Sequence, residues 1–120
     1  MRCLIVDDSQ EFLDAARTLL MGEGVDVVGT ASTSHEALEL VAEMRPEIVL
    51  VDVNLGTESG FALARAMSEA PTPERAAVIL ISTHSEDDYA ELLESSPAIG
   101  FLSKSAVSGN GIRAVIDSRN

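Results

Sequence analysis

Five polar residues that could act together follow short apolar runs of this 120-residue chain. They are Asp7, Asp8, Asp52, Ser82 and Lys104. Three carboxylates packed together repel one another, so such a cluster needs compensating positive charge from the lysine and from a hard cation such as Mg²⁺. The hydroxyl and the ammonium would then hold a tetrahedral anion. Since a carboxylate can also serve as a nucleophile, the set predicts a site that handles a phosphoryl group with Mg²⁺ beside it.

Each of these residues alone has a simpler explanation. An aspartate directly after a strand usually just starts a turn, and a serine or a lysine at a strand end is usually solvated. The functional interpretation therefore depends on all five residues meeting at one place in the fold.

The apolar runs provide the elements that would bring them together. The run 48–52 is aliphatic without a polar break until Asp52, which is typical of a strand buried on both faces of a parallel sheet. Strands are expected at 3–6, 25–28, 48–52, 77–81 and 99–102, with the second nearer a sheet edge. Helices are expected at 10–22, 35–45, 61–69, 86–95 and 112–117, and Pro71 and Pro73 mark the exit from the third.

Local signals set the ends and faces of these helices. Ser9, Ser34 and Ser85 are expected to cap the first, second and fourth. The first helix is expected to bury Phe12, Ala16, Leu19 and Leu20, and the second Ala37, Leu38, Val41 and Met44. Strands that alternate with helices predict an α/β domain with one parallel sheet, in which right-handed crossovers open the strand ends on a single edge.

Composition excludes several classes of function. A formal net charge of −12 argues against direct binding of nucleic acid or of an anionic membrane by this domain. The single cysteine, Cys3, precludes a disulfide framework and is expected to be a buried small hydrophobe. Without a signal peptide or an apolar stretch of roughly 20 residues, the chain is expected to be one cytoplasmic domain over 1–120.

The spaced motifs resemble the receiver domains of two-component response regulators over essentially the whole chain. The matching stretches are Val6-Asp7-Asp8-Ser9, Leu50-Val51-Asp52 with Gly60 in the following loop, Leu80-Ile81-Ser82-Thr83 and Gly100-Phe101-Leu102-Ser103-Lys104. The resemblance implies a flavodoxin-like, doubly wound five-stranded parallel sheet of order 2-1-3-4-5.

The resemblance also assigns the site residues. It implies that Asp52 accepts a phosphoryl group from a sensor histidine kinase. It implies that Asp7 and Asp8 bind Mg²⁺ together with Asp52 and the backbone carbonyl of Asn54. Lys104 would neutralise the phosphoryl oxygens.

A conformational switch is implied as well. Ser82 would turn toward the new phosphate and Phe101 would move into the vacated space, which would change a surface made by the fourth helix, the fifth strand and the fifth helix. The resemblance also implies that Asn54 and His84 occupy the positions that, in the family, tune water access and so the lifetime of the acyl phosphate, although His84 is equally consistent with a plain solvated loop residue.

Two positions depart from the family pattern near this site. Gly56 stands where a proline is common, so that loop is expected to be more mobile than usual. Ser105 replaces the proline that frequently follows the lysine, and a cis Lys104–Ser105 peptide would be costly.

Alternatives remain for the function of the whole protein. The stretch from Gly100 to Ser105 resembles receivers that precede helix-turn-helix DNA-binding domains, which is consistent with a C-terminal DNA-binding effector. A phosphorylation-dependent homodimer is a further candidate partner. A stand-alone receiver that acts by protein contact fits equally well. A Mg²⁺-dependent aspartyl-nucleophile phosphatase would want an acid where Asn54 stands, and a flavodoxin-like binding module would want a Ser/Thr/Gly-rich turn instead of Asp7-Asp8.

Overall fold

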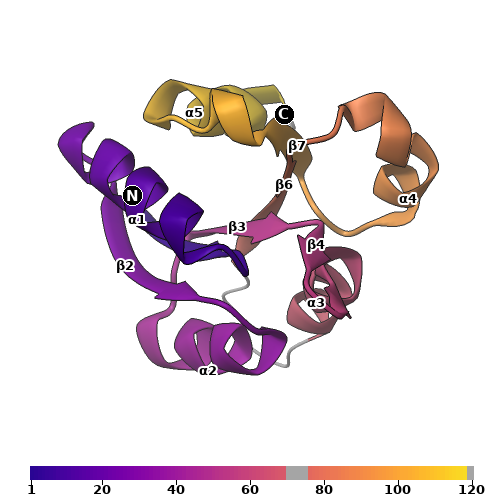
Figure 1. Ribbon diagram of the computed structural model, residues 1–120, viewed down its shortest axis with the longest axis horizontal. Coiled ribbons are helices and arrows are strands. Elements are labelled where there is room, and N and C mark those ends of the chain that lie inside the picture. The colour runs from indigo at the N-terminus through magenta and orange to yellow at the C-terminus, as the bar shows by residue number, and fades with distance from the viewer. Residues whose placement is uncertain (70–75, 119–120) are drawn as a thin grey trace.

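The computed structural model describes residues 1–69 and 76–118, in which helices surround a central sheet (Figure 1). The strands are β1 (Arg2–Val6), β2 (Asp26–Ala31), β3 (Ile48–Asp52), β6 (Ala77–Ser82) and β7 (Gly100–Ser103), with a small hairpin of β4 (Asn54–Leu55) and β5 (Glu58–Ser59). The helices are α1 (Gln10–Gly22), α2 (Ser34–Met44), α3 (Gly60–Ser68), α4 (Ala90–Ser95) and α5 (Gly109–Ser118), and two 3₁₀ turns are η1 (Glu86–Tyr89) and η2 (Lys104–Ala106). Pro71 and Pro73 lie outside the described residues.

The five long strands form one parallel sheet of order β2-β1-β3-β6-β7. Counted along the chain this is the order 2-1-3-4-5, so the expected doubly wound α/β fold is confirmed, as is the edge position of β2. The register aligns the strand ends, because Val6 pairs with Val51, Asp52 with Ile81 and Ser82 with Ser103. The polar residues that follow these positions therefore arrive at the same carboxyl edge of the sheet.

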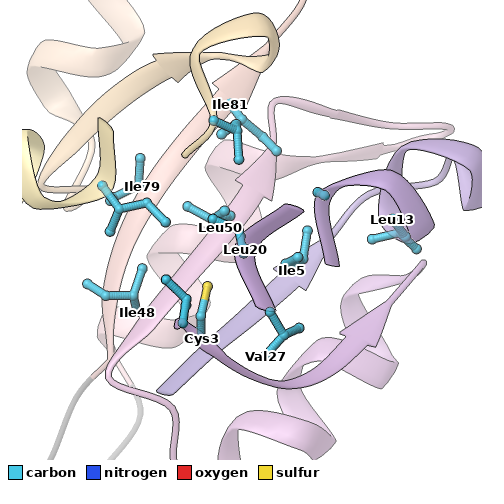
Figure 2. Packing of buried hydrophobic residues seen from close by; sticks show 13 residues of the cluster. Cys3, Ile5, Leu13, Leu20, Val27, Ile48, Leu50, Ile79 and Ile81 are labelled. Atoms are coloured by element: carbon cyan, nitrogen blue, oxygen red, sulfur yellow. The ribbon is translucent and has the colours of Figure 1, made fainter. Parts of the chain in front are cut away.

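Burial on both faces explains why the strands read as unbroken aliphatic runs. Alternate residues point to opposite sides: Cys3, Ile5, Leu50 and Ile79 pack toward α1 and α5 (Figure 2), whereas Leu4, Val6, Val49 and Leu80 pack toward α2 and α3. The prediction that Cys3 is a buried hydrophobe is confirmed, since its side chain is fully covered.

The outer helices bury fewer of their apolar residues than the sequence suggested. The buried residues of α1 are Leu13, Ala16 and Leu20, so the predicted face was wrong for Leu19, which is 48% exposed. In α2 only Ala37 is fully buried and Leu38 is exposed, while Leu40 and Val41 are partly covered. Helix α2 packs mainly against β2, the strand at the edge of the sheet.

Several element ends also differ from expectation. The cap of α2 is Thr33, not Ser34, whereas Ser9 caps α1 as predicted by accepting the Phe12 N–H. Helix α5 begins at Gly109, earlier than expected, because the Ser108 hydroxyl oxygen accepts the Gly111 N–H at 2.9 Å and a carboxylate oxygen of Glu23 accepts the Gly109 N–H at 3.0 Å.

The helix after β6 begins with a turn that the sequence did not predict. Ser85 is the N-cap residue as predicted, and its N–H donates to a carboxylate oxygen of Asp88 at 3.3 Å, but the helix that follows opens as the 3₁₀ turn η1 before becoming α4. The Lys104–Ser105 peptide is trans, like every other peptide bond of the described chain. Within the described residues, no helix has the length and apolarity required to cross a lipid bilayer.

Candidate functional site

Three carboxylates meet at the carboxyl edge of the sheet. Asp7 and Asp8 directly follow β1, and Asp52 is the last residue of the neighbouring strand β3. One oxygen from each lies within 4.8 Å of the others. Asp7 is fully buried and Asp52 is 6% exposed, whereas Asp8 faces solvent. We call these three residues the acid cluster, and it is the grouping that the sequence predicted.

Lys104 joins the acid cluster from η2, directly after β7. Its ammonium nitrogen lies 2.5 Å from Oδ2 of Asp7 and 3.2 Å from Oδ2 of Asp52, and its side chain is only 16% exposed. The ring of Phe12 in α1 lies beneath this ammonium, 4.6 Å from the nitrogen to the ring centroid, which is a cation–π distance. The lysine is thus held between two carboxylates and an aromatic face.

The surroundings raise the pKa values of both Asp52 and Lys104. Burial raises the pKa of Asp52, and the nearby charge of Asp7 raises it further, against the lowering effects of the Asn54 N–H and of Lys104. Burial alone would lower the pKa of Lys104, but its bonds to Asp7 and Asp52 outweigh this and raise the pKa. One ammonium facing three carboxylates leaves the cluster short of positive charge.

The acid cluster has the properties of a cation site. Oδ1 of Asp7 accepts the Ser9 N–H at 2.8 Å, whereas the buried Oδ2 has the Lys104 ammonium beside it and no backbone or hydroxyl donor among the described residues. Together with the oxygens of Asp8 and Asp52, Oδ2 offers the hard ligands that Mg²⁺ prefers.

The loop after Asp52 is folded into a tight hairpin, which the sequence did not predict. Asn54 opens it, and the Asn54 N–H donates to Oδ1 of Asp52 at 3.2 Å. Gly56 at its tip has φ +67°, and a Cβ at this position would lie 3.6 Å from Oδ2 of Asp8. The tip of the hairpin therefore lies beside the acid cluster.

Gly60 closes the same loop for a steric reason. A Cβ on Gly60 would lie 2.1 Å from the carbonyl oxygen of Asp52, so only glycine allows this approach. The Gly60 N–H donates to the carbonyl of Val53 at 2.8 Å, which fixes the start of α3 against the end of β3.

Ser82 and Phe101 lie at the same edge, but the serine is turned to other partners. Ser82, at the end of β6, is buried, and its hydroxyl oxygen accepts the His84 N–H at 3.0 Å. The same hydroxyl lies 3.5 Å from the hydroxyl of Tyr89, which belongs to η1. Phe101 in β7 is half-buried and His84 is exposed. The structure thus brings the acid cluster and Lys104 together, whereas the Ser82 hydroxyl is hydrogen-bonded within its own loop.

Tyr89 is the residue of this edge that sequence reasoning missed. Its ring contacts Phe61, His84 and Phe101 at centroid distances of 6.0, 6.3 and 6.2 Å. As the sole tyrosine of a chain without tryptophan, it stood out in composition alone.

The sheet order and the acid cluster at its carboxyl edge define a doubly wound, CheY-like α/β domain. The chain belongs to the response regulator receiver domain family, whose model matches residues 3–116.

Curated relatives and solved structures agree with this membership. The chain is 31% identical over 118 residues to the probable transcriptional regulatory protein NarL of Mycobacterium tuberculosis, covering 98% of this chain and 54% of that protein. It superposes on the signal receiver domain of the same NarL with a TM-score of 0.80, covering 98% and 94% of the two chains. It is also 33% identical to an Archaeoglobus fulgidus protein-glutamate methylesterase/protein-glutamine glutaminase, over 87% of this chain and 30% of that protein. The chain thus spans between about a third and a half of these curated relatives.

Proposed function

We propose that this receiver accepts a phosphoryl group on Asp52 from a histidine kinase, in a reaction that requires Mg²⁺. The observation that carries the proposal is the buried contact of Lys104 with both Asp7 and Asp52, with Asp8 beside them. A carboxylate that shares a site with a second acid and an ammonium can attack phosphorus while its surroundings hold the phosphoryl oxygens.

The phosphoryl transfer needs no reactant other than Asp52 and the phosphorylated histidine of the donor. An oxygen of Asp52 forms the new bond to phosphorus as the bond from phosphorus to the donor's imidazole nitrogen breaks, and that nitrogen keeps the electron pair. The raised pKa of Asp52 makes its ionised form a better nucleophile than an ordinary aspartate. Lys104 holds its charge, because its pKa is also raised, and neutralises the oxygens of the transferred group.

Mg²⁺ would be held by Asp7, Asp8, Asp52 and the backbone carbonyl of Asn54. When bound, it supplies the positive charge that the cluster lacks and screens the negative charge that develops on the phosphoryl oxygens. Asp7 contributes the buried Oδ2 that now has only the ammonium beside it.

Ser82 and Phe101 would respond to the new phosphate. The Ser82 hydroxyl would turn toward a phosphoryl oxygen and Phe101 would change position, which would alter the surface formed by α4, β7 and α5. Asn54 and His84 are both exposed near the acid cluster and the Ser82 loop, where they would set water access and so the lifetime of the acyl phosphate.

The domain over 1–120 would pass this change to an effector in the cytoplasm. A C-terminal DNA-binding effector is the form we favour, because the chain aligns along nearly all its length with part of a transcriptional regulatory protein. Phosphorylation would then favour a homodimer. The receiver itself, with a net charge of −12, would not contact DNA. The methylesterase activity belongs to the name of the Archaeoglobus fulgidus relative, of which this chain spans 30%. Nothing favours a phosphatase, because Asn54 offers no titratable proton.

The test is to incubate the protein with acetyl phosphate and Mg²⁺ and to weigh it intact. We expect one labile phosphoryl group, absent after chelation of Mg²⁺ and absent in Asp52→Asn. Asp26→Asn is the matched control, since Asp26 is exposed at the amino end of β2, on the opposite edge of the sheet. A phosphoryl group retained in Asp52→Asn would refute the assignment.

A further inference from the structure

Tyr89 touches both residues of the proposed switch. It is the last residue of η1, directly before α4, and it is half-buried. Its hydroxyl lies 3.5 Å from the hydroxyl of Ser82, and its ring packs on Phe101 with planes tilted by 38°. One side chain thus bridges the polar and the aromatic member of the pair.

The ring is held by two further elements. Phe61 of α3 packs against it at a tilt of 50°, and His84 meets it nearly edge-on at 68°. Such tilted and edge-on pairs are the favourable arrangements of aromatic rings at these separations. Movement of Tyr89 therefore cannot leave Phe101 undisturbed.

The Ser82 hydroxyl can donate only one hydrogen bond, so it cannot donate to Tyr89 and to a phosphoryl oxygen at the same time. A serine hydroxyl carries one proton, and the oxygen of Ser82 already accepts the His84 N–H. To donate to a phosphoryl oxygen on Asp52, Ser82 must turn its proton away from Tyr89. At 3.5 Å the contact with Tyr89 is long for two hydroxyls, so a charged oxygen would compete with it successfully.

Phe101 also has space on its outer side. It lines an open groove of about 480 Å³ together with Leu102, Ser103 and the segment 83–86. The ring is therefore bounded by Tyr89 in one direction and by a groove in another.

We propose that Tyr89 is a positioning residue that couples Ser82 to Phe101. It holds the serine hydroxyl in the unphosphorylated arrangement, and its release when Ser82 turns is what moves Phe101. This role depends on the proposed function of Asp52, but the coupling itself exists in the unphosphorylated protein and is measurable there.

The single tyrosine gives a direct spectroscopic test. The full chain labelled with 3-fluorotyrosine has one ¹⁹F NMR resonance, at Tyr89. We expect Ser82→Ala and Phe101→Leu each to shift this resonance. Thr83→Ala is the matched control, since Thr83 is an exposed neighbour in the same loop, and we expect it to leave the resonance in place. Equal spectra for Ser82→Ala and Thr83→Ala would overturn the proposal.

Beryllium fluoride with Mg²⁺ mimics a phosphoryl group on a carboxylate. It tests whether a change at Asp52 reaches Tyr89 through Ser82. We expect it to shift the Tyr89 resonance in the wild-type protein and to have a much smaller effect in Ser82→Ala. An unmoved resonance in a protein that intact mass shows to be phosphorylated by acetyl phosphate would overturn the role of Tyr89 and leave the proposed function standing. Absence of any phosphoryl addition would refute the proposed function, and the comparison of Ser82→Ala with Thr83→Ala would still decide the coupling.

Two variants of the tyrosine separate coupling from packing. Tyr89→Phe keeps the ring and frees Ser82, so we expect severalfold faster phosphorylation by acetyl phosphate with little loss of stability. Tyr89→Leu also removes the aromatic contacts, so we expect Phe101 to lose its fixed position in NMR spectra. If Tyr89→Phe were phosphorylated at the wild-type rate, the hydroxyl contact would have no restraining role and the proposal would fail.

Discussion

Lys104 and Asp7 form a buried ion pair, with the ammonium nitrogen 2.5 Å from the carboxylate oxygen Oδ2. They come from opposite ends of the chain and meet only because β1 and β7 open on the same edge of the sheet. The lysine thus covers the oxygen that we propose as a ligand of Mg²⁺. Lysine and metal therefore compete for Asp7 in the unphosphorylated protein.

Lys104→Met should destabilise the metal-free protein by about 3 kcal/mol, because it leaves buried Asp7 without its partner. Mg²⁺ should restore much of this loss and should bind the variant more tightly than the wild-type protein. Urea unfolding with and without Mg²⁺ measures both effects. His35→Ala removes an exposed pair with Glu39 and should change stability by no more than about 0.5 kcal/mol. If Mg²⁺ bound more weakly to Lys104→Met, the two cations would not be competing.

Asp52→Asn should stabilise the protein at neutral pH. Burial and Asp7 raise the pKa of Asp52, so the fold disfavours its ionised form. The native state then binds the proton more tightly than the unfolded state, and the wild-type protein gains stability as the pH falls from the raised pKa to about 3.9, the value in the unfolded chain. The advantage of the variant should shrink over that interval. Urea unfolding across a pH series would contradict this if the advantage grew toward acid pH.

Gly60→Ala should destabilise the fold by about 2–3 kcal/mol, since its Cβ would overlap the carbonyl oxygen of Asp52. It should also impair phosphorylation, because the end of β3 would have to shift. Gly22→Ala is the control: nothing lies within 4 Å of that Cβ at the end of α1, so stability should rise by up to about 1 kcal/mol. Circular dichroism during urea unfolding measures both changes in the free energy of unfolding. If Gly60→Ala left this free energy unchanged, the loop would have shifted to accommodate the Cβ without cost, against the prediction.

The thiol of Cys3 should be unreactive until the protein unfolds. Burial raises its pKa to about 12, so at pH 8 only about 10⁻⁴ of the thiol would be ionised even if reagent could reach it. Labelling with a disulfide reagent such as DTNB along a urea gradient should follow the unfolding transition. Rapid labelling of the native protein would show that β1 opens locally.

The sequence was most informative where local and tertiary requirements coincide. Strands β1, β3 and β6 were predicted from their aliphatic runs, because burial on both faces leaves a signal in every residue. The acid cluster and Lys104 were predicted for a related reason: each lies at or just after the end of one of the sheet strands, so the topology alone brings them together.

Features that depend on distant contacts were not predictable. The start of α5 has a local signal in Ser108, whose hydroxyl oxygen accepts the Gly111 N–H, but the contact of Glu23 with Gly109 joins elements that are far apart in the sequence. Tyr89 received no role, since its significance comes from Phe61 and Phe101, which lie on other elements. Leu19 has the spacing of a buried residue, but the axial rotation of α1 favours Leu13 instead.

The division of the core by the sheet has a mechanical consequence. Tyr89 and Phe101 pack with the apolar layer that includes α3, whereas α1 and the apolar residues of α5 belong to the layer on the other side. Reorientation of these two rings would therefore change the side of the sheet on which they lie and the neighbouring edge at β7 and α5. The surface of α1, on the other side of the sheet, would keep the same shape in both signalling states.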